Sequence, residues 1–166
     1  MINTLEGIVK KLNLLPHPEG GYYRETYRAD PFSVPPKELG IDKERNLSTA
    51  IYFLLTKGNF SAFHRIKQDE VWHHYLGDAI AIHCISPEGA YEKLLLGKEF
   101  ENGELPQHVV TGGTWFASET LGEYSLAGCT VAPGFDFADF EMAERTILLS
   151  YYSEHRDVIT ALTRNT

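Results

Sequence analysis

Apolar and polar positions alternate along most of the chain, a pattern that indicates β-strands. In a strand, successive side chains point to opposite faces, so a two-residue period marks a strand with one buried face. Segments with this pattern or with continuous apolar character, bounded by Gly-containing turns, occur at 22–28, 49–55, 60–66, 70–76, 79–85, 91–96, 107–110, 114–119 and 124–132. Their spacing is typical of an all-β antiparallel sandwich or barrel. Strands and helices do not alternate along the sequence, so a parallel sheet is not expected.

Helical periodicity occurs only near the two ends of the chain. Leu5, Ile8 and Leu12 share one apolar stripe, which predicts a short helix over about 3–13. A second, C-terminal helical segment is predicted over about 144–162. The barrel is expected between them, over about 22–140, and the whole chain, 1–166, is expected to form a single domain.

Composition and charge narrow the classes of partner. Of the residues, 43% are hydrophobic and 23% are charged, which is close to the globular average. The 15 Lys and Arg residues against 23 Asp and Glu residues give a net charge of −8. This balance argues against nucleic acid or an anionic membrane surface as a partner. No apolar run reaches the roughly 18 residues of a membrane span, and the N-terminus lacks a signal-peptide pattern, so a cytoplasmic protein is expected.

The densest group of polar and aromatic side chains lies on two predicted strands joined by a tight turn. Strand parity places Glu70, Trp72 and His74 on one face of the second strand, and His64 lies on the first. If these faces line the barrel interior, the four side chains meet in one cavity. An imidazole beside a carboxylate suits proton transfer near neutral pH, and the same groups suit a divalent metal. A single β-bulge would exchange His73 for His74.

The spacing of these residues resembles the first motif of the cupin superfamily. Gly58, His64, Glu70 and Gly77 stand at the spacing of that motif, and Ile66 stands where the pattern usually has a second His. The chain resembles more specifically the cupin type five family, through HPEGGYYRETYR (17–28), STAIYFLL (48–55), FHRIKQDEVWHHYLGD (63–78), GGTWFAS (112–118) and GCTVAPGFDFADFE (128–141). The resemblance implies a double-stranded β-helix, the cupin jelly roll. The chain is also similar in layout to the dTDP-sugar epimerases, a cupin branch that works without metal.

The second cupin motif resembles TGGTWF (111–116), with Phe116 in place of the usual His. Metal-binding cupins use two His and a Glu from the first motif and one His from the second, so only His64 and Glu70 match. Two ligands hold a divalent ion weakly, and His74 is the candidate third ligand if it points inward. The resemblance therefore implies a cavity suited to an organic ligand, with no cofactor expected and a divalent metal as the weaker alternative.

Four further residues are candidates for ligand binding. Trp72 and Phe116 are expected to form stacking walls of the cavity. Arg24 would reach a carboxylate or phosphate of the ligand, or would lie solvated on an edge or dimer-interface strand. Tyr124 would donate a proton opposite His64, as a Tyr does in sugar epimerases, or would pack in the core or at the rim.

Three other features receive structural interpretations. Phe135, Phe137 and Phe140 are interpreted as anchors that fasten the C-terminal segment to the barrel, with a role in the pocket wall as the alternative. His17 is one of several scattered histidines to which no role is assigned. The Pro-containing segment 30–46 is either a lid over the cavity or a surface connection.

These observations lead to one functional hypothesis and two alternatives. The hypothesis is a small-molecule-binding cupin that acts as a metal-independent isomerase or epimerase on a sugar-like or nucleotide-sugar substrate. His64 would be the base, with Glu70 and His74 setting its orientation and protonation. The first alternative is a non-catalytic metabolite-binding module. The second, weaker alternative is a metal-dependent cupin enzyme. Because jelly-roll cupins commonly dimerise through edge strands, we expect a homodimer that involves residues 22–28.

Overall fold

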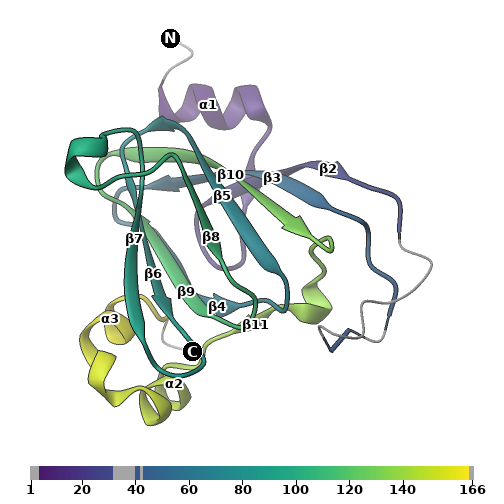
Figure 1. Cartoon of the computed structure of the whole chain (residues 1–166). Coiled ribbons are helices and arrows are strands. Elements are labelled where there is room, and N and C mark those ends of the chain that lie inside the picture. Colours follow the sequence, from purple (N-terminus) through teal and green to yellow (C-terminus); the bar gives the residue numbers. More distant parts are fainter. Residues whose placement is uncertain (1–3, 32–39, 42, 165–166) are drawn as a thin grey trace.

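Two antiparallel sheets lie face to face and form the body of the protein (Figure 1). The computed structural model describes residues 4–31, 40–41 and 43–164. The first sheet contains, in spatial order, β1 (Leu15–Pro16), β2 (Tyr22–Arg28), β3 (Thr49–Thr56), β10 (Tyr124–Ala132), β5 (Asp69–Gly77) and β8 (Gln107–Val110). The second contains β11 (Glu141–Met142), β4 (Phe60–Arg65), β9 (Trp115–Thr120), β6 (Ile80–Ile85) and β7 (Tyr91–Leu96). This arrangement is an antiparallel sandwich, as the strand pattern predicts, with the jelly-roll form that the cupin resemblance implies.

The nine predicted strands are all present, and no end differs from its predicted position by more than one residue. β1 and β11 were not predicted, because a strand of two residues is too short to show a period. Both short strands lie at the outer ends of their sheets. β1 pairs only with Tyr22 and Tyr23, so the outer edge of β2 from Arg24 to Arg28 is unpaired within the described residues. The homodimer stays a prediction, which this free edge favours.

The N-terminal helix α1 (Leu5–Leu12) packs on the outer face of the first sheet (Figure 1). It begins at Thr4, whose hydroxyl accepts a hydrogen bond from the Gly7 N–H at 3.2 Å. It ends at Asn13, which adopts a left-handed conformation with φ of 51°. The helix was predicted over about 3–13, so its extent agrees with the apolar stripe.

The C-terminal segment forms two short helices, α2 (Arg145–Tyr151) and α3 (Arg156–Ala161), joined by the 3-10 turn η4 (Ser153–His155). They cover the outer face of the second sheet, where Leu148 and Ile159 pack against Phe63 and Ile85. Two further 3-10 turns are η2 (Phe100–Asn102) and η3 (Phe137–Asp139). The segment agrees with the helical region predicted over about 144–162.

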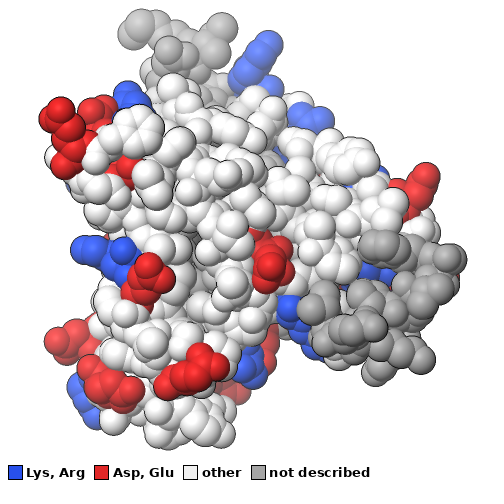
Figure 2. All heavy atoms as spheres, viewed as in Figure 1, with Lys and Arg blue, Asp and Glu red and all other residues white. Residues whose placement is uncertain are grey.

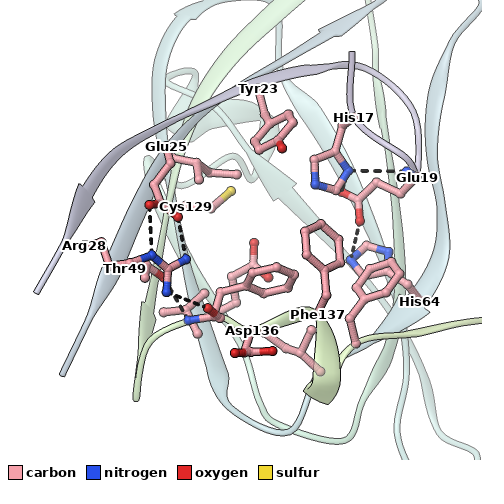
Figure 3. A pocket seen from close by; sticks show the side chains of 16 residues that line it. His17, Glu19, Tyr23, Glu25, Arg28, Thr49, His64, Cys129, Asp136 and Phe137 are labelled. Carbon is pink, nitrogen blue, oxygen red and sulfur yellow. Dashed lines mark hydrogen bonds and ion pairs between the residues drawn. The ribbon is translucent and has the colours of Figure 1, made fainter. Parts of the chain in front are cut away.

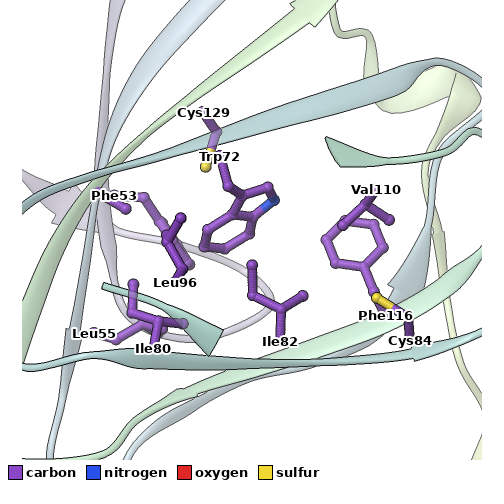
Figure 4. Packing of buried hydrophobic residues seen from close by; sticks show 11 residues of the cluster. Phe53, Leu55, Trp72, Ile80, Ile82, Cys84, Leu96, Val110, Phe116 and Cys129 are labelled. Carbon is purple, nitrogen blue, oxygen red and sulfur yellow. The ribbon is translucent and has the colours of Figure 1, made fainter. Parts of the chain in front are cut away.

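The space between the sheets contains the main hydrophobic cluster (Figure 4). Trp72 from β5 and Phe116 from β9 are each 1% exposed, and their rings meet edge to face at 6.4 Å. Phe53 from β3 packs against Trp72 in the same way at 5.6 Å. The remaining space between the sheets forms the pocket described below, so core and pocket share the barrel interior.

Charged side chains on the face shown in Figure 2 follow the acidic composition. Acidic side chains gather at the lower left, where α2 and α3 lie, and basic side chains are scattered singly. In the part of the chain that the structure describes, no helix combines the length and the apolar character needed to cross a membrane.

Candidate functional site

A pocket of about 490 Å³ lies between the two sheets (Figure 3). β2, β3, β5 and β10 of the first sheet and β4 of the second contribute side chains to it. The loop residues at 17–19 and 135–140 close its sides. Its walls carry both titratable and aromatic groups, a combination typical of small-molecule sites.

His64 on β4 occupies the inner end of the pocket and is 3% exposed. Its Nδ1 lies 2.7 Å from the Ala62 carbonyl, and because a carbonyl oxygen only accepts, Nδ1 carries a proton. Its Nε2 lies 3.1 Å from the Glu19 carboxylate. The rings of Phe116 and Phe140 flank the imidazole at centroid distances of 4.1 and 5.3 Å. His64 is therefore held with Nε2 directed at an acidic partner.

Burial sets the protonation states of His64 and of the carboxyl groups near it. It lowers the pKa of His64, although the hydrogen bond to the Ala62 carbonyl and the charge of Glu70 oppose the shift. Burial raises the pKa of Glu19 to about 7, against the opposing effect of His17. It also raises the pKa of Glu70 to about 7. Near neutral pH the pocket therefore holds a neutral imidazole beside carboxyl groups that are balanced between acid and base, as acid–base catalysis requires.

Glu19 reaches His64 because of the glycine turn that follows it. Gly20 has φ of +119°, and a Cβ there would lie 2.0 Å from the Phe60 carbonyl oxygen. The backbone therefore passes so close to β4 that only glycine fits. The Ala62 N–H donates to the Glu19 carbonyl at 2.9 Å, which fastens the turn to β4 beside His64.

His17 supports the turn from the other side. The Glu19 N–H donates to His17 Nδ1 at 3.3 Å, and the same Nδ1 lies 3.6 Å from the Glu19 carboxylate. Tyr23 packs edge-on against the imidazole at 4.5 Å, and Phe137 stacks over it at 6.5 Å. Burial lowers the pKa of His17, so it too favours the neutral form.

Glu70 faces the pocket from β5 and is 8% exposed. The thiol of Cys129 on β10 is hydrogen-bonded to it. Burial and the neighbouring carboxyl group raise the pKa of Cys129 well above its ordinary value. Cys129 is therefore a neutral thiol that donates to Glu70, not an activated nucleophile.

The opposite side of the pocket is built around Arg28 (Figure 3). Its Nε and Nη2 donate to the two carboxylate oxygens of Glu25 at 2.9 and 2.6 Å. Its Nη1 donates to Asn46 Oδ1 at 2.7 Å and to the Phe135 carbonyl at 3.1 Å. Arg28 thus fastens the segment after β10 to β2.

Phe135, Phe137 and Phe140 form the aromatic wall of the pocket. Their rings contact one another edge to face, at centroid distances of 5.0, 6.2 and 5.8 Å. Arg45 holds the wall in place, because its guanidinium donates to both carboxylate oxygens of Asp139 at 2.7 and 2.9 Å. These phenylalanines, interpreted from the sequence as anchors, also face the ligand space.

Two predicted site residues, His64 and Glu70, are brought together in the pocket. Trp72 and Phe116 lie in the adjoining hydrophobic cluster, and the ring of Phe116 meets the site at His64. Parity along β5 correctly places Glu70 and Trp72 on one inward face. Parity does not show how far along the strand the pocket extends, and Trp72 lies beyond the end of the pocket.

The structure does not bring Arg24, His74 or Tyr124 to the pocket. Arg24 is exposed on β2 and donates to the Leu12 carbonyl at 3.1 Å, at the end of α1. His74 Nε2 lies 3.1 Å from the Asp78 carbonyl. Tyr124 lies at the start of β10 and packs with the cluster under α1.

The alternative histidine of β5 does not reach the pocket either. His73 lies on the opposite face, where its imidazole meets Gln107 at 3.3 Å and Thr130 at 3.4 Å. A register shift between β5 and β10 does occur, near His74, but it leaves both histidines outside the pocket.

Sequence reasoning missed much of the pocket, above all Glu19, His17 and the Glu25–Arg28 pair. Glu19 and His17 lie in a turn without periodicity, so no pattern assigned their side chains to a face. The available signal was the Gly20–Gly21 pair directly after a charged residue. Residues 32–39 and 42 of the predicted lid segment lie outside the described residues.

The pocket does not fit a cupin metal site. Among the described residues, no group of three or more His, Cys, Asp or Glu side chains is arranged to hold a metal ion. His64 Nδ1 is bound to a backbone carbonyl and its Nε2 is directed at Glu19. Ile66 and Phe116 supply apolar groups at the two positions where the cupin motifs usually have His.

Comparisons with known proteins agree with the fold. An uncharacterized protein of Saccharomyces cerevisiae, YML079W, is 31% identical over 150 residues, which cover 82% of this chain and 74% of that protein. The crystal structure of protein SO0799 from Shewanella oneidensis has a TM-score of 0.89 and 38% identity, over 99% of both chains. A hypothetical protein from Leishmania major has a TM-score of 0.90 and 37% identity, over 98% of this chain and 100% of that chain.

A more distant likeness concerns the fold alone. Oxalate decarboxylase from Bacillus subtilis has a TM-score of 0.56 and 15% identity, over 89% of this chain and 36% of that chain. This likeness and the two-sheet topology confirm the predicted cupin jelly roll. The sequence profile of the cupin superfamily family Cupin_5 (DUF985) matches residues 6–143. The chain therefore belongs to this family of the cupin superfamily.

Proposed function

We propose that this cupin is a metal-independent enzyme that transfers a proton on a small, sugar-like molecule, as an isomerase or epimerase does. The Glu19–His64 pair carries the proposal: a carboxylate lies 3.1 Å from an imidazole Nε2 inside a pocket. Burial brings the pKa of Glu19 to about 7, where a group can both accept and return a proton.

The pair acts as one base. In its basic form it consists of a neutral imidazole and a carboxylate, with one negative charge. A proton taken from the carbon beside a substrate carbonyl makes the pair neutral overall. A proton from solvent goes to the carbonyl oxygen, and the substrate becomes an enol. The pair then returns a proton to carbon, at another position or face, and the enol releases a hydroxyl proton to solvent, which gives the isomer.

An unphosphorylated sugar-like substrate fits better than a nucleotide-sugar. A diphosphate needs cationic partners. Arg28 is the one Lys or Arg side chain among the described residues that line the pocket, and its guanidinium is already bound to Glu25. Phosphate binding would have to break that pair.

The test is proton exchange with solvent. Incubating the wild type with a panel of aldoses and ketoses in D₂O should replace a carbon-bound hydrogen by deuterium, which NMR detects. Glu19→Gln and His64→Gln should each slow this exchange by about 100-fold or more. Glu123→Gln, which changes an exposed carboxylate paired with Lys57, is the matched control and should exchange at the wild-type rate.

The non-catalytic alternative predicts a different result. A binding module would show a ligand-dependent rise in melting temperature without any exchange, and that outcome would refute the proposed catalysis. For the metal-dependent alternative, metal analysis of protein purified without chelator is decisive. Stoichiometric metal, together with exchange that a chelator abolishes, would overturn the metal-independent mechanism.

A further inference from the structure

The charges that line the pocket do not balance. The lining contains four carboxyl groups, those of Glu19, Glu25, Glu70 and Asp136, and one guanidinium, that of Arg28. Arg28 is bound to Glu25, so this pair is neutral. Behind the wall the Arg45–Asp139 pair is neutral as well, although Lys67 lies 3.9 Å from Asp139 at the surface. Among the described lining residues, three carboxyl groups therefore face the ligand space without a cation of their own.

The sequence of residues 32–39 and 42, which lie outside the described residues, adds no excess of positive charge. Residues 32–39 contain one Lys and one Glu, and residue 42 is an Asp. These residues therefore add no net positive charge to the chain. An anionic ligand would be repelled by the negative charge of the pocket, whereas a cationic ligand would be attracted.

Glu70 is the carboxyl group that most requires a partner. It is 8% exposed and directed into the pocket. Its hydrogen-bond donor within the described residues is the Cys129 thiol, which is a weak donor, and no N–H or O–H group reaches it. A buried carboxylate without a strong donor is costly, and an ammonium group would supply a charge-assisted hydrogen bond.

The aromatic wall offers a second attraction for a cation. Phe135, Phe137 and Phe140 line the same pocket, with their rings 5.0 to 6.2 Å apart. The faces of aromatic rings carry negative partial charge and attract ammonium groups. Asp136 lies within the same segment and also lines the pocket. Carboxylate and aromatic groups thus combine as they do in known sites for organic cations.

We propose that the molecule bound in this pocket carries a protonated amino group, which lies between Glu70 and the aromatic wall formed by Phe135, Phe137 and Phe140. The substrate class is an amino sugar or a comparable small polar amine. This inference rests on the proposed function for the identification of the pocket as the substrate site. It narrows the sugar-like substrate to one with positive charge.

Two sets of matched ligands test the inference by calorimetry at pH 7. The first is glucosamine, glucose and glucose 6-phosphate, which share a ring and differ in charge. The second is ethanolamine and its neutral analogue ethylene glycol. We expect the cationic member of at least one set to bind at least tenfold more tightly than its neutral analogue, and glucose 6-phosphate not to bind. No preference for the cation in either set, or tighter binding of the phosphate, overturns the inference.

A variant locates the effect. Glu70→Gln keeps the shape of the side chain. It should weaken the binding of the cationic ligand by about tenfold or more and leave the affinity for the neutral analogue unchanged. Glu123→Gln is the matched control and should bind as the wild type does. A Glu70→Gln variant that melts like the wild type and keeps the full cation preference also overturns the inference. Binding and deuterium exchange are separate readouts: cation binding without exchange refutes only the catalysis, and exchange on neutral sugars without cation preference refutes only the amine.

Discussion

The Nε2 atom of His64 lies 3.1 Å from the carboxylate of Glu19, and the two residues come from different parts of the chain. His64 belongs to β4, whereas Glu19 belongs to the turn that precedes β2. The backbone connects them as well, because the carbonyl of Glu19 accepts a hydrogen bond from Ala62 on β4. This double attachment fixes the carboxylate against the imidazole before any ligand arrives, and such preorganisation is what proton transfer requires.

The first prediction concerns pH and stability. The pKa of Glu19 is about 7 in the folded protein, against an ordinary value of 4.5. Between these values the folded chain holds a proton that the unfolded chain has released, so the free energy of unfolding falls as pH rises. Glu19→Gln removes this contribution. The stability of the variant relative to wild type should therefore increase from pH 4.5 to 7, by up to about 1.4 kcal/mol per pH unit, and stay constant above pH 7.

Urea denaturation across pH 4.5 to 8 measures this difference. His64 and His17 titrate in both proteins, so the comparison largely removes their effects. Glu123→Gln, which removes an exposed carboxylate outside the pocket, is the matched control. A Glu19→Gln difference that is independent of pH would contradict the assigned burial.

The second prediction concerns the glycine turn. Gly20→Ala places a Cβ 2.0 Å from the Phe60 carbonyl, at a φ of +119° that alanine rarely adopts. We expect a loss of stability of about 3 kcal/mol or more, together with loss of exchange activity because Glu19 is displaced. Gly58→Ala is the matched control, since Gly58 has φ of +76° with nothing within 4 Å of its Cβ. It should cost about 1 kcal/mol and leave activity intact. Equal losses in the two variants would argue against the close approach of the turn to β4.

The third prediction separates the core from the pocket wall. Trp72→Phe should lower stability by about 1–2 kcal/mol and leave ligand affinity unchanged. The loss is moderate because the buried Trp72 Nε1 has no hydrogen-bond partner among the described residues, so no bond is broken. Phe137→Ala, at a residue that is 53% exposed, should cost less than about 1 kcal/mol but weaken the binding of a cationic ligand about threefold or more. Calorimetry and urea denaturation distinguish these results, and the reverse pattern would show that Trp72 lines the site.

The fourth prediction concerns the ion pair behind the aromatic wall. Burial alone would raise the pKa of Asp139, but hydrogen bonds from Arg45 and Gln68 outweigh it and lower the pKa. Asp139→Asn leaves the buried Arg45 without its anion and should cost about 3 kcal/mol at pH 7. Glu141→Gln, which breaks an exposed pair with Arg65, should cost less than about 1 kcal/mol. The advantage of wild type over Asp139→Asn should begin to shrink as pH falls through 3.8, the ordinary pKa of the unfolded chain, and should disappear only below the lowered pKa of the folded carboxyl group. A difference that persists at such pH would contradict the role of charge.

The sequence predicts the fold closely because strand periodicity is a local property. The nine alternating or apolar segments and the glycine turns between them suffice for an antiparallel sandwich or barrel, and the resemblance to cupins adds the jelly-roll topology. The same periodicity correctly faces His64 and Glu70 inward, since each lies in a well-defined strand. Periodicity sets the face of a residue but not its depth, and for this reason it could not separate Glu70, at the pocket, from Trp72, in the core.

The rest of the site depends on contacts that no local pattern records. Glu19 and His17 lie in a turn whose position is set by the close approach of Gly20 to β4. Phe137 lies after the last long strand and reaches the pocket only because Arg45 and Arg28 hold its segment in place. Such residues are identified by tertiary contacts, and a single sequence does not contain these.

The pocket walls come from well-separated stretches of the chain: 17–28, 49–51, 64–70 and 129–140. A nascent chain on the ribosome therefore cannot complete the pocket until residue 140 has emerged, although Glu19, His64 and Glu70 are made much earlier. Non-local pairing of this kind also slows folding relative to helical proteins. Ligand binding consequently reports a chain that is folded at least through residue 140, and shorter fragments released early in synthesis are expected to be inert.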